Sequence, residues 1–123
     1  MGRLNGLEDF KSYLPEEIIH LGNDLEKDQQ VPFEIEWLGK DSDILWVFGG
    51  CHCTDAYYEN GKIKGTINMS RAGYDRETGV VSQHVHVYLN DGNEYYISDT
   101  KKRRVSNPLS NYVSITLSGK VKV

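Results

Sequence analysis

The sequence predicts an all-β domain, a two-layer sandwich of about seven mainly antiparallel strands. Three observations support this prediction. Apolar and polar residues alternate with a period of two in several segments. Clusters of Asn, Asp and Gly separate these segments, and no convincing helical pattern lies between them. The chain has 123 residues, which is enough for one two-layer core but not for two.

The first 14 residues are expected to form a separate arm. Apolar residues recur there at helical spacing, and Pro15 follows as a stop. These apolar residues are Leu4, Leu7, Phe10, Tyr13 and Leu14. We therefore expect a short helical or extended docking arm over residues 1–14, and the sandwich domain over residues 15–123.

Three strands are predicted before the cysteines. Residues 16–21 form the first and end at the turn cluster of residues 22–24. Residues 31–38 alternate cleanly and form the second. Pro32 has no N–H to donate, so it should lie at the start of this strand or on a sheet edge. Residues 44–48 are apolar on both parities, which predicts a strand covered on both faces.

Further strands are predicted after the cysteines. They are residues 62–69, 81–89, 94–98 and 111–123. Residues 55–60 lead into the pair Asn60-Gly61, which is typical of a tight hairpin turn. On residues 81–89 the period of two places His84 and His86 on one face, opposite the apolar residues.

The composition favours a thin core with one solvated face on each strand. Hydrophobic residues make up 38% of the chain and charged residues 26%. We expect the core to contain the large apolar residues of both layers. They are Phe33, Trp37, Trp46, Phe48, Ile67, Val85 and Ile115.

Charge and hydropathy restrict the partners. The net charge is −4, so the chain as a whole repels nucleic acid and anionic membranes. No run approaches the roughly 20 apolar residues needed to cross a bilayer, and the N-terminus lacks the apolar core of a signal peptide. We therefore expect a protein that is cytoplasmic in the producing cell and is not secreted by a signal peptide. The only concentrated positive charge is Lys101–Arg104, which could be a solvated loop, a protein contact or a phosphate contact.

The two cysteines stand one residue apart. A disulfide between Cys51 and Cys53 at a strand end would be strained, so free thiols are expected. With His84 and His86 they could form a Cys₂His₂ zinc site; otherwise they are small buried side chains and the histidines lie on a solvated face. Cys53 with His84 is a conceivable nucleophile pair, but the chain contains no recognisable nucleophile elbow or oxyanion hole. We therefore predict neither enzymatic activity nor a cofactor.

Four segments follow one another in a characteristic order: Val31-Pro-Phe-Glu-Ile-Glu-Trp, Cys51-His52-Cys53-Thr54, the glycine-led strand Gly61–Met69, and the terminal Gly119-Lys-Val. Together they resemble the bacterial CGCT-turn family, domain of unknown function 1573, which is similar to the ASH/Hydin type of immunoglobulin-like domain. The resemblance implies an immunoglobulin-like sandwich that serves as a binding or scaffolding module. A copy without a leader and with its own arm would fit a virus-encoded accessory protein, such as a phage capsid or tail decoration subunit.

The predicted function is thus a non-enzymatic structural or interaction module, virion-associated, that binds neighbouring protein subunits or a second copy of itself. Eight tyrosines suit such an interface, although cross-strand pairing on a solvated face would also use them. The expected contact residues are Leu4, Leu7, Phe10, Tyr13, Tyr57, Tyr58, Lys101, Lys102, Arg103 and Arg104. The alternatives are a small metal- or thiol-dependent protein centred on the cysteines and His84/His86, and a nucleic-acid-binding module that uses Lys101–Arg104.

Overall fold

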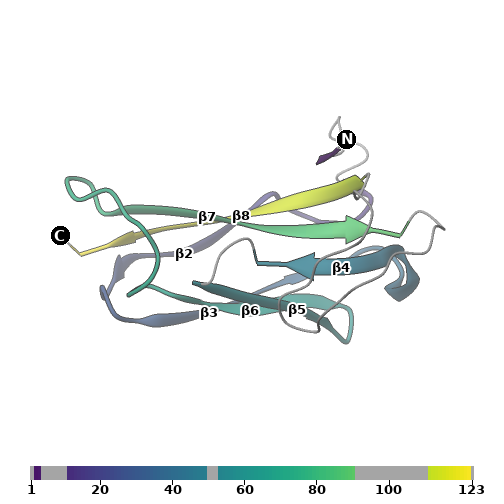
Figure 1. Ribbon diagram of the computed structural model, residues 1–123, viewed down its shortest axis with the longest axis horizontal. Helices are drawn as coiled ribbons and strands as arrows, with labels where there is room; N and C mark the ends of the chain where they lie inside the picture. The colour runs from purple at the N-terminus through teal and green to yellow at the C-terminus, as the bar shows by residue number, and fades with distance from the viewer. Residues whose placement is uncertain (1, 4–10, 50–52, 91–110, 123) are drawn as a thin grey trace.

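The computed structural model describes residues 2–3, 11–49, 53–90 and 111–122. Two sheets pack face to face (Figure 1), so the predicted all-β sandwich is confirmed. The elements are β1 (Gly2–Arg3), β2 (Ile18–Leu25), β3 (Gln30–Glu36), the 3₁₀ turn η1 (Asp41–Asp43), β4 (Ile44–Phe48), β5 (Thr54–Glu59), β6 (Lys62–Asn68), β7 (Val80–Leu89) and β8 (Asn111–Val121). The predicted strand over residues 94–98 lies outside the described residues.

The five-stranded sheet is built around the antiparallel pair β7–β8. β4 pairs antiparallel with β7, whereas β1 and β2 pair with different parts of β8 and run parallel to it. The prediction of mainly antiparallel strands is therefore correct for this sheet except along one side of β8. β2 also continues through residues 22–24, where a turn was predicted. Its pairing with β8 carries it past Gly22 as a bulge, with a φ of 133° at that glycine.

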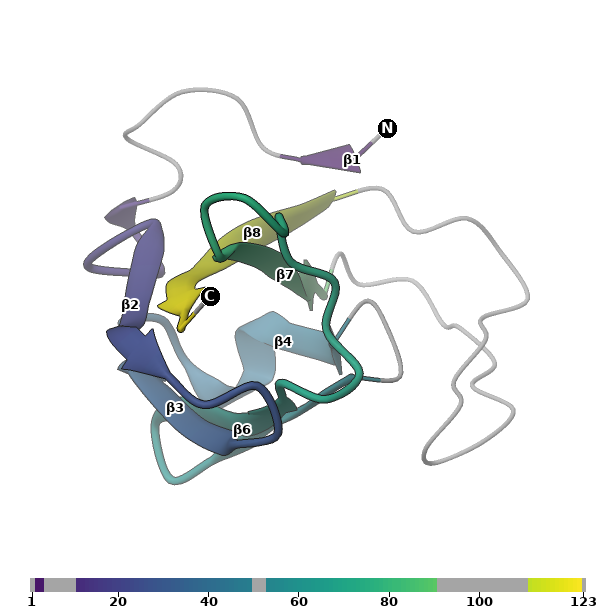
Figure 2. The same ribbon diagram turned by 90° about the vertical axis from the view of Figure 1, so that its left-hand side faces the viewer.

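The three-stranded sheet has the order β3-β6-β5 and is antiparallel throughout. The β5–β6 turn is the predicted Asn60-Gly61 pair, with φ angles of 49° and 81°, as a type I′ turn requires. Among the described strands, β3 pairs with β6 alone, so the expected edge position of Pro32 is confirmed. In the end-on view of Figure 2, β7 and β8 lie above β3 and β6.

The core fills the space between the two sheets. Most of its fully buried residues come from the middle strands of both, among them Ile63, Ile67, Val85, Ile115 and Leu117. Five of the seven predicted core residues are buried or nearly so: Phe33, Trp37, Ile67, Val85 and Ile115.

Trp46 and Phe48 are the two incorrect core predictions. Both lie on the outer face of β4, and 38% of Phe48 is exposed, so the strand is not covered on both faces within the described chain. The register explains the difference. Val47 is paired with the buried Val87, so its neighbours Trp46 and Phe48 point the other way, beside Tyr88 and His86.

The last described residues of the predicted arm pack on the sandwich. Leu14 is fully buried, and the Tyr13 ring stacks on Trp37 with 5.2 Å between ring centroids. The carbonyl of Tyr13 accepts a hydrogen bond of 2.7 Å from the N–H of Leu38. Tyr13 therefore helps to hold residues 11–14 against the domain.

The loop between β6 and β7 is held in shape by Asp75. Its carboxylate accepts backbone hydrogen bonds from Glu77 at 2.8 Å and from Thr78 at 3.1 Å. These bonds stabilise the ionised form and lower the pKa of Asp75. The backbone of Asp75 adds two further bonds, to Val80 and from Gly79.

We predict that Asp75 makes the stability of the loop depend on pH. A carboxyl group whose pKa falls on folding stabilises the fold above its unfolded pKa and loses that contribution as the pH falls through its folded pKa. The native protein should therefore be more stable than an Asp75→Asn variant near neutral pH, and the difference should shrink between about pH 5 and about pH 2. Urea unfolding of both proteins across that range measures it. A difference that stays constant with pH would contradict the prediction.

Candidate functional site

The outer face of the three-stranded sheet is charged and solvated. Acidic and basic residues face each other across its strands, with ion pairs at 2.9 Å between Lys62 and Glu34 and at 3.2 Å between Lys64 and Glu59. Lys62 also lowers the pKa of Glu34. These groups are exposed or, for Lys64, partly buried, so the pairs add little to stability and leave the face well hydrated.

The outer face of the five-stranded sheet has a different chemistry. Over the middle of this face the outward side chains are Ile18 and His20 of β2, Trp46 and Phe48 of β4, Ser82, His84, His86 and Tyr88 of β7, and Tyr112, Ser114, Thr116 and Ser118 of β8. None of these is Asp, Glu, Lys or Arg, although Asp24 near the end of β2 is exposed. Lys120 is the first described charged residue met along β8, opposite Val80. A surface with few charged residues and several aromatic ones is typical of the centre of a protein interface.

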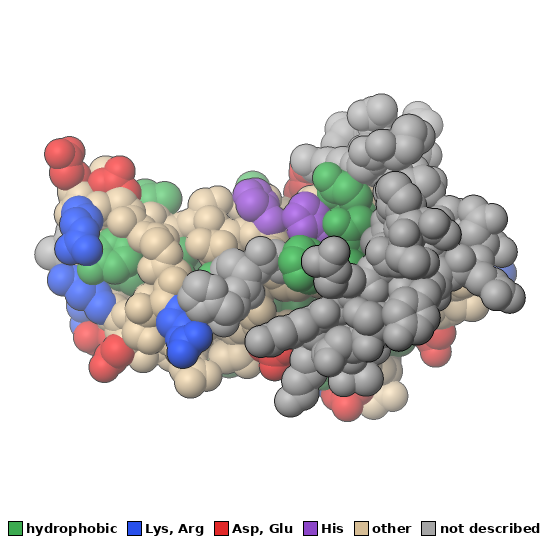
Figure 3. Space-filling model, in the orientation of Figure 1, with side chains coloured by type: hydrophobic (Ala, Val, Ile, Leu, Met, Phe, Trp, Pro, Cys, Tyr) green, Lys and Arg blue, Asp and Glu red, His purple; other side chains and the backbone are tan. Residues whose placement is uncertain are grey.

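Five rings on this face form one group, here called the aromatic cluster: Trp46, Phe48, His86, Tyr88 and Tyr112. The strand register assembles it, because Trp46 is paired with Tyr88 and Tyr88 with Tyr112 across three strands. The ring centroids of Trp46 and Tyr88 are 5.4 Å apart and their ring planes differ by 18°, and the ring centroids of Tyr88 and Tyr112 are 5.0 Å apart. Each such contact is worth about 0.5–1.5 kcal/mol beyond its area. Figure 3 shows histidine side chains beside hydrophobic ones on the upper edge of the view.

The second row of the cluster centres on His86. Its ring stacks beside Phe48 at 6.5 Å and meets the edge of Tyr112 at 4.7 Å. Its Nδ1 is 3.0 Å from Oγ of Ser114, which is only 8% exposed although it points away from the core. The rings therefore shelter the sheet beneath them and are fixed by their neighbours.

The surroundings of Tyr88 favour the neutral form of its hydroxyl group. Partial burial raises the pKa of Tyr88, and the neighbouring Tyr112 raises it further. With Phe48 exposed at its margin, the cluster offers apolar ring surface together with neutral hydrogen-bonding groups. Such a surface suits non-covalent binding.

The expected contact residues are only partly brought together. Tyr57 is 46% exposed, but it lies on the charged three-stranded sheet. The half-buried Tyr58 donates a hydrogen bond to the carboxylate of Asp41 and accepts one from the N–H of Gly61 at 3.1 Å. Leu4, Leu7, Phe10 and Lys101–Arg104 lie outside the described residues. The aromatic cluster was not predicted as a site. The alternation in residues 81–89 nevertheless indicated one part of it, because it places Tyr88 on the outward face.

The expectation of free thiols is wrong for Cys53, which is disulfide-bonded and 4% exposed. The expectation assumed the geometry of a strand end. Cys53 instead lies in a turn just before β5, so the limits that an extended strand imposes do not apply. The other cysteine of the chain, Cys51, lies outside the described residues.

The histidines of the alternative zinc site share a face, as predicted, but the Nδ1 atom of each lies beside a hydroxyl group. The Nδ1 of His86 is hydrogen-bonded to Oγ of Ser114, and the Nδ1 of His84 is 3.4 Å from Oγ1 of Thr116. A disulfide sulfur is not the thiolate that zinc binds. Within the described residues, no three His, Cys, Asp or Glu side chains are grouped closely enough to hold a metal ion.

Among the described residues, no helix has the length and apolar character to cross a bilayer. The resemblance to the CGCT-turn family stays a prediction. Comparison of the chain with family models, with curated proteins and with solved structures finds no match.

Proposed function

We propose that this protein is a non-enzymatic interaction module, a β-sandwich that binds neighbouring protein subunits of a larger assembly through the outer face of its five-stranded sheet. One observation carries the proposal. The two outer faces of the same sandwich differ in kind: the three-stranded sheet shows cross-strand ion pairs, whereas the five-stranded sheet shows the aromatic cluster and neutral polar groups. A protein partner favours the second face, because burying it desolvates few charges.

The composition of the cluster supports a protein partner. Trp and Tyr dominate the residues whose truncation costs most at protein interfaces. Here their rings are already stacked on one another, so little side-chain freedom remains to be lost on binding. Hydroxyl groups and His84 beside the cluster supply hydrogen bonds at its border.

The kind of assembly follows from the sequence resemblance rather than from the site. A phage capsid or tail decorated by this protein is the assembly that we propose. The partner would present an apolar, weakly charged patch to the aromatic cluster, and the charged three-stranded sheet would remain in solvent.

Hydroxyl-radical footprinting tests this proposal. The assembly that contains the protein is purified, and side-chain oxidation is compared between the assembled protein and the protein released from it. We expect Trp46, Tyr88 and Tyr112 to be oxidised several-fold more slowly in the assembly. Tyr57 is the matched control, because it is an exposed tyrosine on the opposite sheet. Protection of Tyr57 with unchanged oxidation of the cluster would place the interface on the three-stranded sheet and contradict the proposal.

A further inference from the structure

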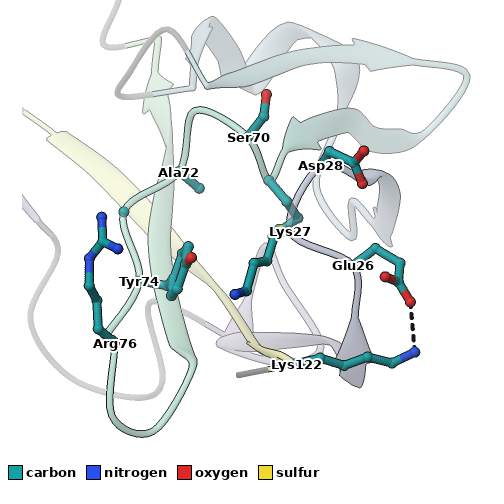
Figure 4. A pocket seen from close by; sticks show the side chains of 10 residues that line it. Glu26, Lys27, Asp28, Ser70, Ala72, Tyr74, Arg76 and Lys122 are labelled. Carbon is teal, nitrogen blue, oxygen red and sulfur yellow. Dashed lines mark hydrogen bonds and ion pairs between the residues drawn. The ribbon is translucent and has the colours of Figure 1, made fainter.

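A separate hollow lies at the end of the sandwich where the chain finishes. It has a volume of about 860 Å³. Three segments that are far apart in the sequence line it: the β2–β3 turn, the β6–β7 loop and Lys122 after β8. Figure 4 shows these segments meeting around the hollow. A volume of this size is within the range of small-ligand sites.

Three cations line this hollow, and of these Lys122 alone forms an ion pair with a described residue. Lys122 forms an ion pair of 2.6 Å with Glu26, which raises the pKa of Lys122. Lys27 and Arg76 take part in none of the ion pairs of the described chain. The remaining acidic residue of the lining is Asp28. In Figure 4 it lies farther from Tyr74 than the end of the Lys27 side chain does. Positive charge without a partner is thus concentrated on the side of Lys27 and Arg76.

Tyr74 lies between these two cations. The guanidinium carbon of Arg76 is 6.0 Å from the centre of the Tyr74 ring, and the Lys27 side chain points toward the ring from the other side (Figure 4). Met69 and Ala72 are almost fully buried and form an apolar floor.

The position of Arg76 is set by the loop that carries it. Asp75, directly before it, is tied to the backbone of Glu77 and Thr78. The N–H of Ala72 likewise donates to the carbonyl of Asn68 at 3.1 Å. The hollow is therefore formed in the free protein.

We propose that this hollow binds an anionic group, a carboxylate or a phosphate, that reaches the Arg76 guanidinium and the Lys27 ammonium around the edge of the Tyr74 ring. Arg offers a planar pair of donors to either anion, and Lys adds a compact charge. The anion could belong to an acidic side chain of a protein or to free phosphate. This site uses none of the residues of the aromatic cluster, so it stands or fails independently of the proposed interface.

Titration of the full, isotope-labelled chain followed by NMR tests the site. One arm uses sodium phosphate and the other a short peptide of alternating Gly and Asp, both at constant ionic strength. We expect saturable shifts at the amides of Lys27, Tyr74 and Arg76. Tighter binding of the peptide would identify a protein carboxylate as the ligand class, and tighter binding of phosphate would identify phosphate. The absence of saturation with both probes would overturn the proposal.

Paired variants separate a site from a general charge effect. A Lys27→Gln/Arg76→Gln protein should bind the better probe about tenfold more weakly. A Lys62→Gln/Lys64→Gln protein loses the same total charge from the outer face of the three-stranded sheet, and its affinity should stay within about twofold of native. Equal weakening in both proteins would overturn the proposal. The four side chains are on the surface, and circular dichroism verifies the fold of each variant.

Discussion

Replacing Gly65 with alanine is expected to reduce the free energy of unfolding by about 3 kcal/mol. Gly65 is buried in β6, the middle strand of the three-stranded sheet, with a strand on each side. A Cβ atom there would overlap the backbone carbonyl of Asp55 and would lie 2.6 Å from Cζ of Phe33. The carbonyl belongs to the paired strand β5, so relief requires a shift of the backbone and a loss of ladder hydrogen bonds.

Gly73 provides the matched control for this substitution. Apart from Gly73 itself and its two chain neighbours, no described residue has an atom within 4 Å of the Cβ position at Gly73, and Gly73 is exposed. A Gly73→Ala protein should therefore remain within about 0.5 kcal/mol of native. Urea unfolding of the three proteins provides the comparison. Equal stability of Gly65→Ala and native protein would mean that β5 and β6 do not pack as described.

The elements that alternate most cleanly could be predicted from the sequence. In β6, and along most of β7 and β8, buried residues alternate with more exposed ones, because successive side chains of a strand point to opposite faces and only one face meets the core. The Asn60-Gly61 turn could also be predicted, since a type I′ turn needs two residues that tolerate a positive φ.

Pairing between distant strands could not be predicted in this way. The parallel contact of β2 with β8 joins residues about a hundred positions apart, and it overrides the local turn propensity of residues 22–24. The face of β4 was ambiguous for a related reason. Residues 44–48 are apolar on both parities, so only the register with β7 determines that Trp46 points outward.

The candidate sites depend on the same long-range information. The aromatic cluster combines β4, β7 and β8, and the hollow combines two loops with the end of the chain. No local motif marks either site, because their residues become neighbours only through the sheet order. The state of Cys53 depended on local turn geometry that the spacing of the cysteines does not reveal.

Replacing Trp46 with alanine should strongly weaken attachment to the assembly while the sandwich stays folded. The substitution removes a ring that stacks on Tyr88 and lies 5.0 Å from Phe48. Loss of a central aromatic residue from an interface typically costs about 2 kcal/mol or more of binding free energy, which is roughly a thirtyfold loss of affinity. The fold should lose only about 1 kcal/mol, because Trp46 is outside the core.

The proposed interface is tested most directly by the binding of Trp46→Ala and Tyr57→Ala proteins to the purified assembly. The native protein is first removed from that assembly. Each labelled protein is titrated against the assembly, and the bound fraction is measured by sedimentation. Tyr57→Ala removes an exposed ring from the opposite sheet and should bind like the native protein. We expect Trp46→Ala to bind roughly thirtyfold more weakly. Native affinity in Trp46→Ala, or an equal loss in both variants, would contradict an interface on the five-stranded sheet.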